Sequence, residues 1–134
     1  MGIIPNDLMP AFQGIVPSGI VSCSAEGEPN VTQISQVYYV DPDHVALSYQ
    51  FFGKTNRNIQ ENPLVSVWVV HAETTVSYRL DLRFIRRETE GDLFEQMEMQ
   101  LAAIASMQGM EAVFKLKGAD IYQVQAITKI DDWE

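Results

Sequence analysis

Residues 44–70 read HVALSYQFFGKTNRNIQENPLVSVWVV, and this stretch decides how the rest of the chain is interpreted. A β-branched run ends near Ser48, and a continuously apolar run begins at Leu64. Between them, Asn62-Pro63 ends a helix of about two turns, because proline disfavours the helical conformation in the residue before it. The stretch therefore predicts a strand, a short loop, a helix and a second strand that is covered on both faces.

The letters GKT at 53–55 also occur in the P-loop, which needs a further glycine at the position that Ser48 occupies here. Bulky residues at 49–52 would obstruct a close phosphate nest, so the sequence disfavours ATP or GTP. A helix start still suits an anion, through its unpaired N–H groups and dipole. Lys54 adds a charge, Thr55 a hydroxyl, and Asn58 can reach back to the same end of the helix. The alternative is an ordinary solvated helix start.

The composition limits the class of protein and its partners. The chain has 134 residues, the length of one domain, so we expect a single domain over 1–134. Its net charge of -9 should repel nucleic acid and anionic membranes, so we expect neither as a partner. A lone cysteine, Cys23, and the lack of a leader-like start favour the cytoplasm.

Strand signals predominate along the chain, with three helical pieces. One helix is expected to begin at Asn6, one lies in the stretch above, and a core-facing one runs from Asp92 to Gln108. Six antiparallel strands in so short a chain leave exposed edges unless the sheet curls into a barrel. The fold class predicted is therefore mainly β with flanking helices (α+β). The predicted strands are residues 18–24, 31–40, 44–48, 64–70, 78–84 and 119–130.

This order of elements resembles the flavin-binding split barrel of the pyridoxamine 5′-phosphate oxidase family over about residues 15–90, and the last strand fits as well. In that family a β-meander leads into a basic pair, a short helix ending in Asn-Pro, and an apolar strand. The resemblance implies a six-stranded antiparallel split β-barrel that binds flavin mononucleotide (FMN).

The resemblance also implies which residues contact the cofactor. Counted back from Asn62-Pro63, the two phosphate-binding basic positions fall on Lys54 and Thr55. Because Thr55 carries no charge, the second positive charge of the family is missing here. Either Arg57 or Asn58 replaces part of its contact with the phosphate, or the cofactor is held more loosely. The full implied set is Gln33, Ile34, Ser35 and Gln36 beside the flavin ring, and Ser48, Tyr49, Lys54, Thr55 and Asn58 near the phosphate.

The function implied is an FMN-dependent oxidoreductase that uses a reduced nicotinamide or another small-molecule redox substrate. The alternatives are a flavin-binding sensor or storage module without turnover, and a split barrel that binds haem or a deazaflavin. His71 is the candidate haem ligand, although a lone histidine at a strand end is more often structural. We predict no metal site and identify no catalytic residue. Because the chain ends in the acidic VQAITKIDDWE, without the basic substrate-binding segment of true pyridoxamine phosphate oxidases, vitamin B6 oxidation is not expected.

Family members usually pair two barrels, so the resemblance also implies a homodimer with FMN at the subunit interface. Aromatic residues near the proposed pocket give limited independent support, because a single small core need not bury them all. These residues are Tyr38, Tyr39, Phe51, Phe52, Trp68 and Tyr78.

Overall fold

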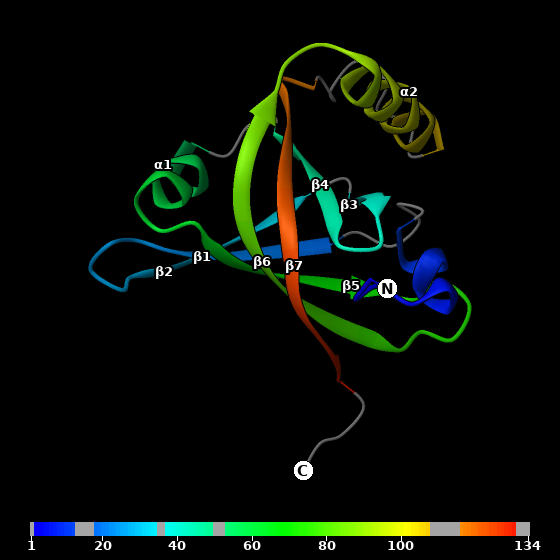
Figure 1. Ribbon diagram of the computed structural model, residues 1–134, viewed down its shortest axis with the longest axis horizontal. Helices are drawn as coiled ribbons and strands as arrows, with labels where there is room; N and C mark the ends of the chain where they lie inside the picture. The colour runs from blue at the N-terminus through cyan, green and yellow to red at the C-terminus, as the bar shows by residue number, and fades with distance from the viewer. Residues whose placement is uncertain (1, 13–17, 35–36, 50–52, 108–115, 131–134) are drawn as a thin grey trace.

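The computed structural model describes residues 2–12, 18–34, 37–49, 53–107 and 116–130 (Figure 1). Within these residues, a seven-stranded antiparallel sheet has the strand order β2-β1-β5-β6-β7-β4-β3. The strands are β1 (Ser18–Cys23), β2 (Pro29–Ile34), β3 (Val37–Asp41), β4 (His44–Tyr49), β5 (Leu64–Val70), β6 (Ser77–Glu88) and β7 (Gly118–Ile130). The helices are α1 (Gly53–Glu61), α2 (Asp92–Met107) and a short 3₁₀ helix, η1 (Asn6–Phe12).

The expectation of six strands is wrong by one, because the stretch predicted as one strand over 31–40 forms two. β2 pairs with β1 and β3 pairs with β4, so the two halves lie at opposite edges of the sheet. Ile34 and Val37 are both buried, at 3% exposure each. Their odd spacing conflicts with the two-residue alternation of a single strand, and this was the sequence signal for a division.

The sheet is open but strongly curved, as in a split barrel. Ile34 ends one edge strand and Val37 begins the other, and so short a connection spans at most ~10 Å. The two edges of the sheet must therefore approach each other at this point. Figure 1 shows the result, with β6 and β7 crossing in front of β1 and β5. The predicted class, mainly antiparallel β with flanking helices, is confirmed.

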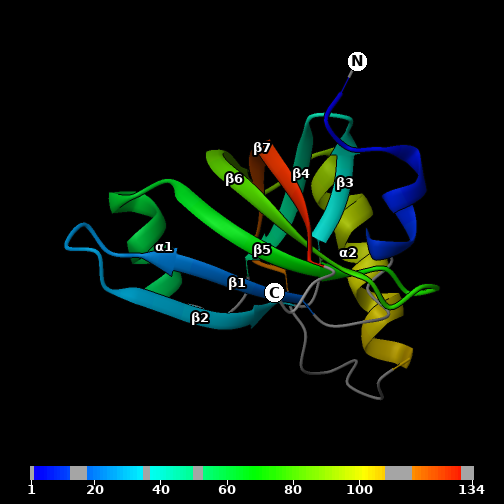
Figure 2. The same cartoon turned by 90° about the horizontal axis from the view of Figure 1, so that it is seen from below.

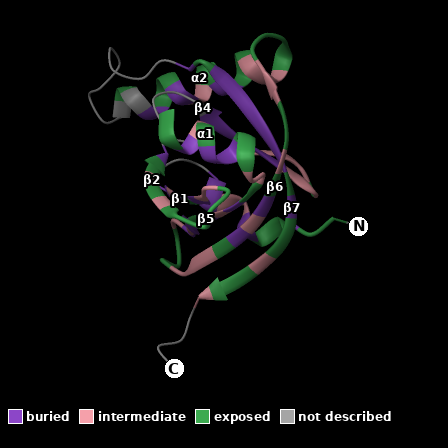
Figure 3. Ribbon diagram, turned by 90° about the vertical axis from the view of Figure 1, so that its left-hand side faces the viewer, coloured by how far each residue is buried: buried purple, intermediate pink, exposed green. Residues whose placement is uncertain are grey.

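The principal core fills the inside of this curved sheet. Val45, Val67, Leu80 and Tyr122 are at most 1% exposed and belong to one apolar cluster. The η1 helix adds further side chains to the same cluster, Leu8 and Phe12 among them. Figure 3 shows the first part of β7 as buried and its far end as mostly exposed.

β5 is covered on one face only, which corrects the prediction that both faces are buried. Its exposure alternates along the strand, and Leu64 and Trp68 remain 47% and 46% exposed. Both residues lie on the outer side of the sheet, opposite the buried Val65 and Val67. A strand sequence that reads as buried on both sides is thus half uncovered in the single chain.

The helix α2 closes a second, smaller core on the outer side of β4 and β7 (Figure 2). Met97 and Leu101 pack there against Ala46, Ala119 and Ile121. The prediction of a core-facing helix over 92–108 is therefore confirmed for Asp92–Met107, while Gln108 lies outside the described residues. Alternating side chains of β4 and β7 serve the two cores, since successive residues of a strand point to opposite faces.

Two methionines of α2 test this packing directly. Met97 is fully buried, whereas Met99 is 73% exposed. We expect Met97→Ala to lower the free energy of unfolding by about 2–5 kcal/mol, because it leaves a cavity between α2 and the sheet. Met99→Ala should change it by less than about 0.5 kcal/mol. Urea denaturation followed by circular dichroism measures both free energies of unfolding. Equal changes in the two variants would contradict the packing of α2 on β4 and β7 through Met97.

Candidate functional site

The first turn of α1 lies against the hairpin formed by β1 and β2. Lys54 Nζ is 2.7 Å from Glu28 Oε1, and the Lys54 side chain is 49% exposed. Thr55 is buried, and its Oγ1 accepts a hydrogen bond of 2.9 Å from Asn30 Nδ2. Lys54 lowers the pKa of Glu28 by direct hydrogen bonding and by charge. A cation is thus present at the helix start, where an incoming anion would have to compete with the Glu28 carboxylate.

Asn58 and Arg57, the two residues considered as substitutes for a second charge, point to different sides of α1. Asn58 is 4% exposed, and its Nδ2 donates to Ser22 Oγ on β1 at 3.2 Å. Ile59 beside it belongs to the principal core. Arg57 is exposed. The Asn58 side chain therefore links α1 to β1 on the side of the helix that faces the sheet, and it does not lie at the solvent-exposed start of the helix.

The residues expected beside a flavin ring fall on an edge strand. Gln33 is exposed and lines a shallow cavity of about 370 Å³ together with Ser18, Gly19, Val31 and Thr32. Ile34 is buried in the core, while Ser35 and Gln36 lie outside the described residues. Among the described strands β2 pairs with β1 alone, so part of its backbone N–H and C=O groups face away from the described sheet. This free edge can hydrogen-bond the polar edge of a planar ligand.

The last part of the predicted site is the end of β4. Ser48 is fully buried and pairs with Ala119 of β7, while Tyr49 pairs with Gly118. The helix α1 begins a few residues later, at Gly53. The structure therefore brings the β1–β2 hairpin and the start of α1 into contact. Ser48 lies on β4, between β7 and β3 in the sheet.

Arg87, near the end of β6, could not be identified as a site residue from the sequence, where it reads as one more basic residue beside Arg86. Its Nε and Nη2 donate to the two carboxylate oxygens of Asp120 at 2.6 and 3.0 Å, and Nη2 also donates to Asn56 Oδ1 at 2.6 Å. Asp120 is 1% exposed, and its burial raises the pKa of this carboxyl while Arg87 opposes the rise. An aspartate in the apolar run of β7 was the available signal, since a buried carboxylate needs a partner.

His71 follows β5 and is held by backbone groups on both sides of its ring. Glu73 and Thr74 direct their N–H groups at Nδ1, at 3.2 and 3.3 Å, while Nε2 lies 3.1 Å from Asp7 O. Because Nδ1 accepts, Nε2 must carry the proton and donate to the Asp7 carbonyl. With both ring nitrogens hydrogen-bonded and the residue 8% exposed, the geometry favours the structural interpretation of His71 over haem ligation.

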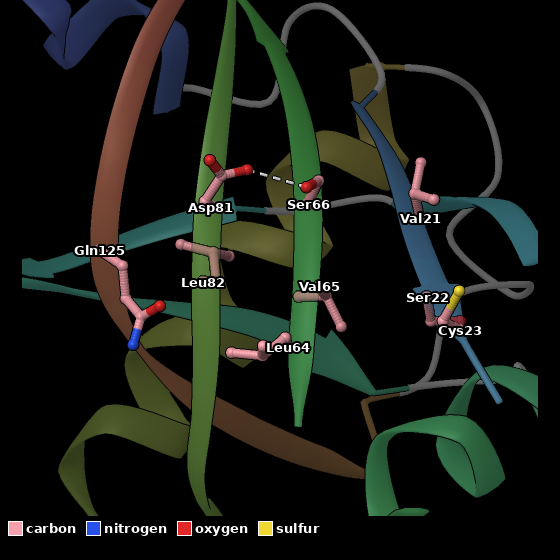
Figure 4. Close-up of a pocket in the computed structure, with 9 residues that line it drawn as sticks. All are labelled: Val21, Ser22, Cys23, Leu64, Val65, Ser66, Asp81, Leu82 and Gln125. Atoms are coloured by element: carbon pink, nitrogen blue, oxygen red, sulfur yellow. Dashed lines mark hydrogen bonds between the residues drawn. The ribbon is translucent and has the colours of Figure 1, made fainter. Parts of the chain in front are cut away.

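The outer side of β1, β2 and β5 is apolar and exposed, and we call it the outer face, defined by Val21, Val31, Leu64 and Trp68. These four side chains are 41–70% exposed. Val21 pairs with Val31 on one side and with Ser66 on the other, so the residues form one surface. Beside it, a cavity of about 290 Å³ opens between β1, β5, β6 and β7. Figure 4 shows this cavity, with Ser66 Oγ donating to Asp81 Oδ1 at 2.9 Å.

Comparison with known proteins decides the family. A family model described as pyridoxamine 5′-phosphate oxidase matches residues 16–125. The chain belongs to this family. No protein with a curated description matches it in sequence at a significant level.

Several solved structures share the fold at low sequence identity. An FMN-binding protein from Syntrophomonas wolfei aligns with a TM-score of 0.77 and 16% identity over 96% of this chain and 88% of that one. An F420 reductase aligns at 0.67 and 11% identity, over 93% and 98% of the two chains. HutZ, a haem storage protein from Vibrio cholerae, aligns at 0.60 and 16% identity, over 96% and 95%. Family membership therefore fixes the fold and leaves the choice of ligand to the site.

In the described part of the chain, no group of three or more histidine, cysteine or acidic side chains could hold a metal ion. Nor is any helix in this part of the chain long and apolar enough to cross a membrane.

The two histidines of the chain form a matched pair for testing the role of His71. His71→Leu should lower the free energy of unfolding by roughly 1–3 kcal/mol, because the N–H groups of Glu73 and Thr74 and the carbonyl of Asp7 lose their hydrogen-bond partner. His44→Leu should have a much smaller effect, since His44 makes only a partly exposed pair with Asp41. Urea denaturation of both variants measures the difference. A His71→Leu protein as stable as the parent would contradict the structural role.

Proposed function

We propose that this member of the pyridoxamine 5′-phosphate oxidase family binds FMN, with the phosphate at the first turn of α1 and the ring along the free edge of β2. The observation that carries the proposal is the contact between the two elements, since Thr55 of α1 and Asn30 of β2 are joined by a hydrogen bond. A cationic helix start and an open backbone edge thus lie side by side. These are the two features that a phosphate and a flavin ring need.

The charges at the helix start suit one phosphate. Lys54 supplies a full positive charge there, and the helix dipole adds an attraction of about 0.3–1 kcal/mol at an exposed site. Glu28 would give up its bond to Lys54, because a phosphate near neutral pH carries more charge than one carboxylate. A charge-assisted bond to Lys54 is roughly twice as strong as a neutral one. With a single phosphate position evident, the mononucleotide is favoured over a dinucleotide.

The proposed activity is that of an oxidoreductase acting on a reduced nicotinamide or another small redox molecule. A bound flavin would supply the hydride or electron transfer, while the chain's own residues orient the ring and exclude water. The alternative is a module that binds flavin without turnover, as a sensor or store. Steady consumption of reduced nicotinamide by the flavin-loaded protein supports the enzyme, and its absence supports the module.

Haem and deazaflavin are the other candidate ligands, because structural neighbours include HutZ and an F420 reductase. The haem proposal is weakened by the histidines. His71 has both ring nitrogens hydrogen-bonded inside the protein, and His44 lies at a turn with its Nδ1 on Asp41. A deazaflavin could use the same phosphate position, so identification of the ligand has to separate it from FMN.

The outer face supports a homodimer with FMN at its interface. The apolar side chains of this face are 41–70% exposed and form one surface, made up of Val21, Val31, Leu64 and Trp68. In addition, β5 has the continuously apolar sequence of a strand that is buried on both sides. A second copy placed on this face would supply the missing cover by two-fold symmetry. A permanent interface of this kind should bury about 2,000 Å² or more in total. The interface would also cover the exposed Gln33 side of β2.

The visible spectrum of the purified protein tests flavin binding. Flavin absorption, with FMN identified by mass after release from the heat-denatured protein, would support the proposal. A colourless protein that also fails to bind added FMN would refute it. A released deazaflavin or a haem spectrum would instead establish the corresponding alternative.

Charge changes at the helix start test where the phosphate binds. Lys54→Ala should weaken FMN binding by about 1.5–3 kcal/mol, the scale of a hydrogen bond to a charged group. Glu28→Gln should strengthen binding, because it removes the carboxylate that competes for Lys54. Fluorescence titration measures both affinities. The matched controls are Lys117→Ala and Glu26→Gln, which make the same charge changes at exposed positions. Unchanged affinity in both test variants would place the phosphate elsewhere.

A charge on the outer face tests the homodimer. Trp68→Glu should convert the dimer to a monomer, because it buries an unpaired carboxylate in the interface, and FMN affinity should fall with dissociation. Met99→Glu, on the exposed side of α2, serves as the control and should leave the dimer intact. Light scattering at micromolar concentration measures the mass. A parent protein that is a 15.1 kDa monomer and still holds FMN would refute the shared site.

A further inference from the structure

Arg87 connects the wall of the barrel to the first turn of α1. Its guanidinium binds both carboxylate oxygens of Asp120 at 2.6 and 3.0 Å and donates to Asn56 Oδ1 at 2.6 Å. Asp120 is 1% exposed, so the carboxylate that holds Arg87 is itself fixed in the sheet. A planar guanidinium bound in this two-pronged way has one orientation. Asn56 therefore receives its hydrogen bond from a rigid donor.

The strands are shaped to admit Arg87 at this position. The pairing of β6 with β7 shifts between Phe84 and Arg86, and such an irregularity re-aims the side chains beyond it. Arg87 consequently faces Asp120, while Arg86 bonds Glu88 at the surface. On β7, Gly118 leaves the space that Arg87 occupies, because a Cβ there would lie 2.8 Å from Arg87 Cδ.

The chemistry of arginine then decides how the Asn56 side chain is turned. A guanidinium only donates hydrogen bonds, so Asn56 must direct its oxygen at Arg87 and its Nδ2 amino group away from it. In the described part of the chain, Nδ2 of Asn56 has no hydrogen-bond acceptor. Asn56 is half-buried on the same helical turn as Lys54 and Thr55. A donor of fixed orientation is thus held on the first turn of α1, on the flank opposite the Lys54–Glu28 pair.

We propose that Asn56 donates a hydrogen bond from Nδ2 to the phosphate of the flavin, and that Arg87, anchored on Asp120, is the positioning residue that turns the amide for this contact. The inference rests on the proposed function. The bond from Asn56 would then replace part of the phosphate contact that a second basic residue would make at the position of Thr55. It would also favour FMN over riboflavin, which has the same ring and no phosphate.

The test compares the affinities of the flavin-free full-length protein for FMN and for riboflavin, both followed by flavin fluorescence. Asn56→Ala should raise the Kd for FMN by about tenfold and leave that for riboflavin unchanged, since one hydrogen bond to a charged group is lost. Asn56→Asp should be worse for FMN than Asn56→Ala. Its carboxylate has the shape of the amide and can still accept from Arg87, but it repels a phosphate. Arg87→Gln should also lower the affinity for FMN relative to that for riboflavin, because the Asn56 amide is then no longer held in one orientation.

The control is Arg86→Gln on the same strand, because the exposed Arg86 pairs with Glu88 of its own strand. If Arg87→Gln fails to fold because Asp120 loses its partner, the Asn56 variants still decide. Equal losses for both flavins would show a merely structural role and overturn the inference. FMN affinity in Asn56→Asp equal to that of the parent would overturn it as well. If the parent binds neither flavin, the proposed function itself fails, and this inference fails with it.

Discussion

The long antiparallel pairing of β6 with β7 is the contact on which the rest of the structure depends. It runs from Ser77 to Glu88 on one strand and from Ala119 to Ile130 on the other. β5, β1 and β2 continue the sheet on the β6 side, and β4 and β3 continue it on the β7 side. Two shifts in its register bend the pair, because an extra residue increases the local twist of a strand. Curvature of the whole sheet starts from this bend.

The bend also assembles the candidate site from segments that are far apart in the sequence. Within the curved sheet, the β1–β2 hairpin meets α1 through the Asn30–Thr55 and Glu28–Lys54 contacts. On the other side of α1, Arg87 reaches the helix from β6. The first turn of α1 is thus held from both flanks, which limits how far its polar groups can move. A ligand phosphate there would meet groups that are already positioned, so less ordering is needed on binding.

The two surfaces of the sheet are completed in different ways. On β4 and β7, α2 covers the outer side and forms its own small core. No element of the described chain covers the outer face of β1, β2 and β5, although its residues are apolar. A surface of this kind usually marks an interaction site. The proposed dimer follows from this uncovered region of the sheet.

Local patterns in the sequence determined much of the fold. The helix ended by Asn62-Pro63 and the core-facing helix from Asp92 were predictable, because proline restriction and helical spacing act over a few residues. The family was recognisable from the order of these elements around Lys54. The same local reasoning joined β2 and β3 into one strand, since both are β-branched and only the phase of burial separates them.

Tertiary structure alone decided which polar groups meet. Arg87 reads as one more exposed arginine until the register shift in β6 turns it toward Asp120, which lies 33 residues away in the sequence. Likewise, the local sequence does not predict the ion pair between Glu28 and Lys54 or the hydrogen bond from Asn58 to Ser22. Sequence patterns fix periodicity and the choice of local conformation. Contacts between distant residues depend instead on strand order and register, which are set by the packing of the whole sheet.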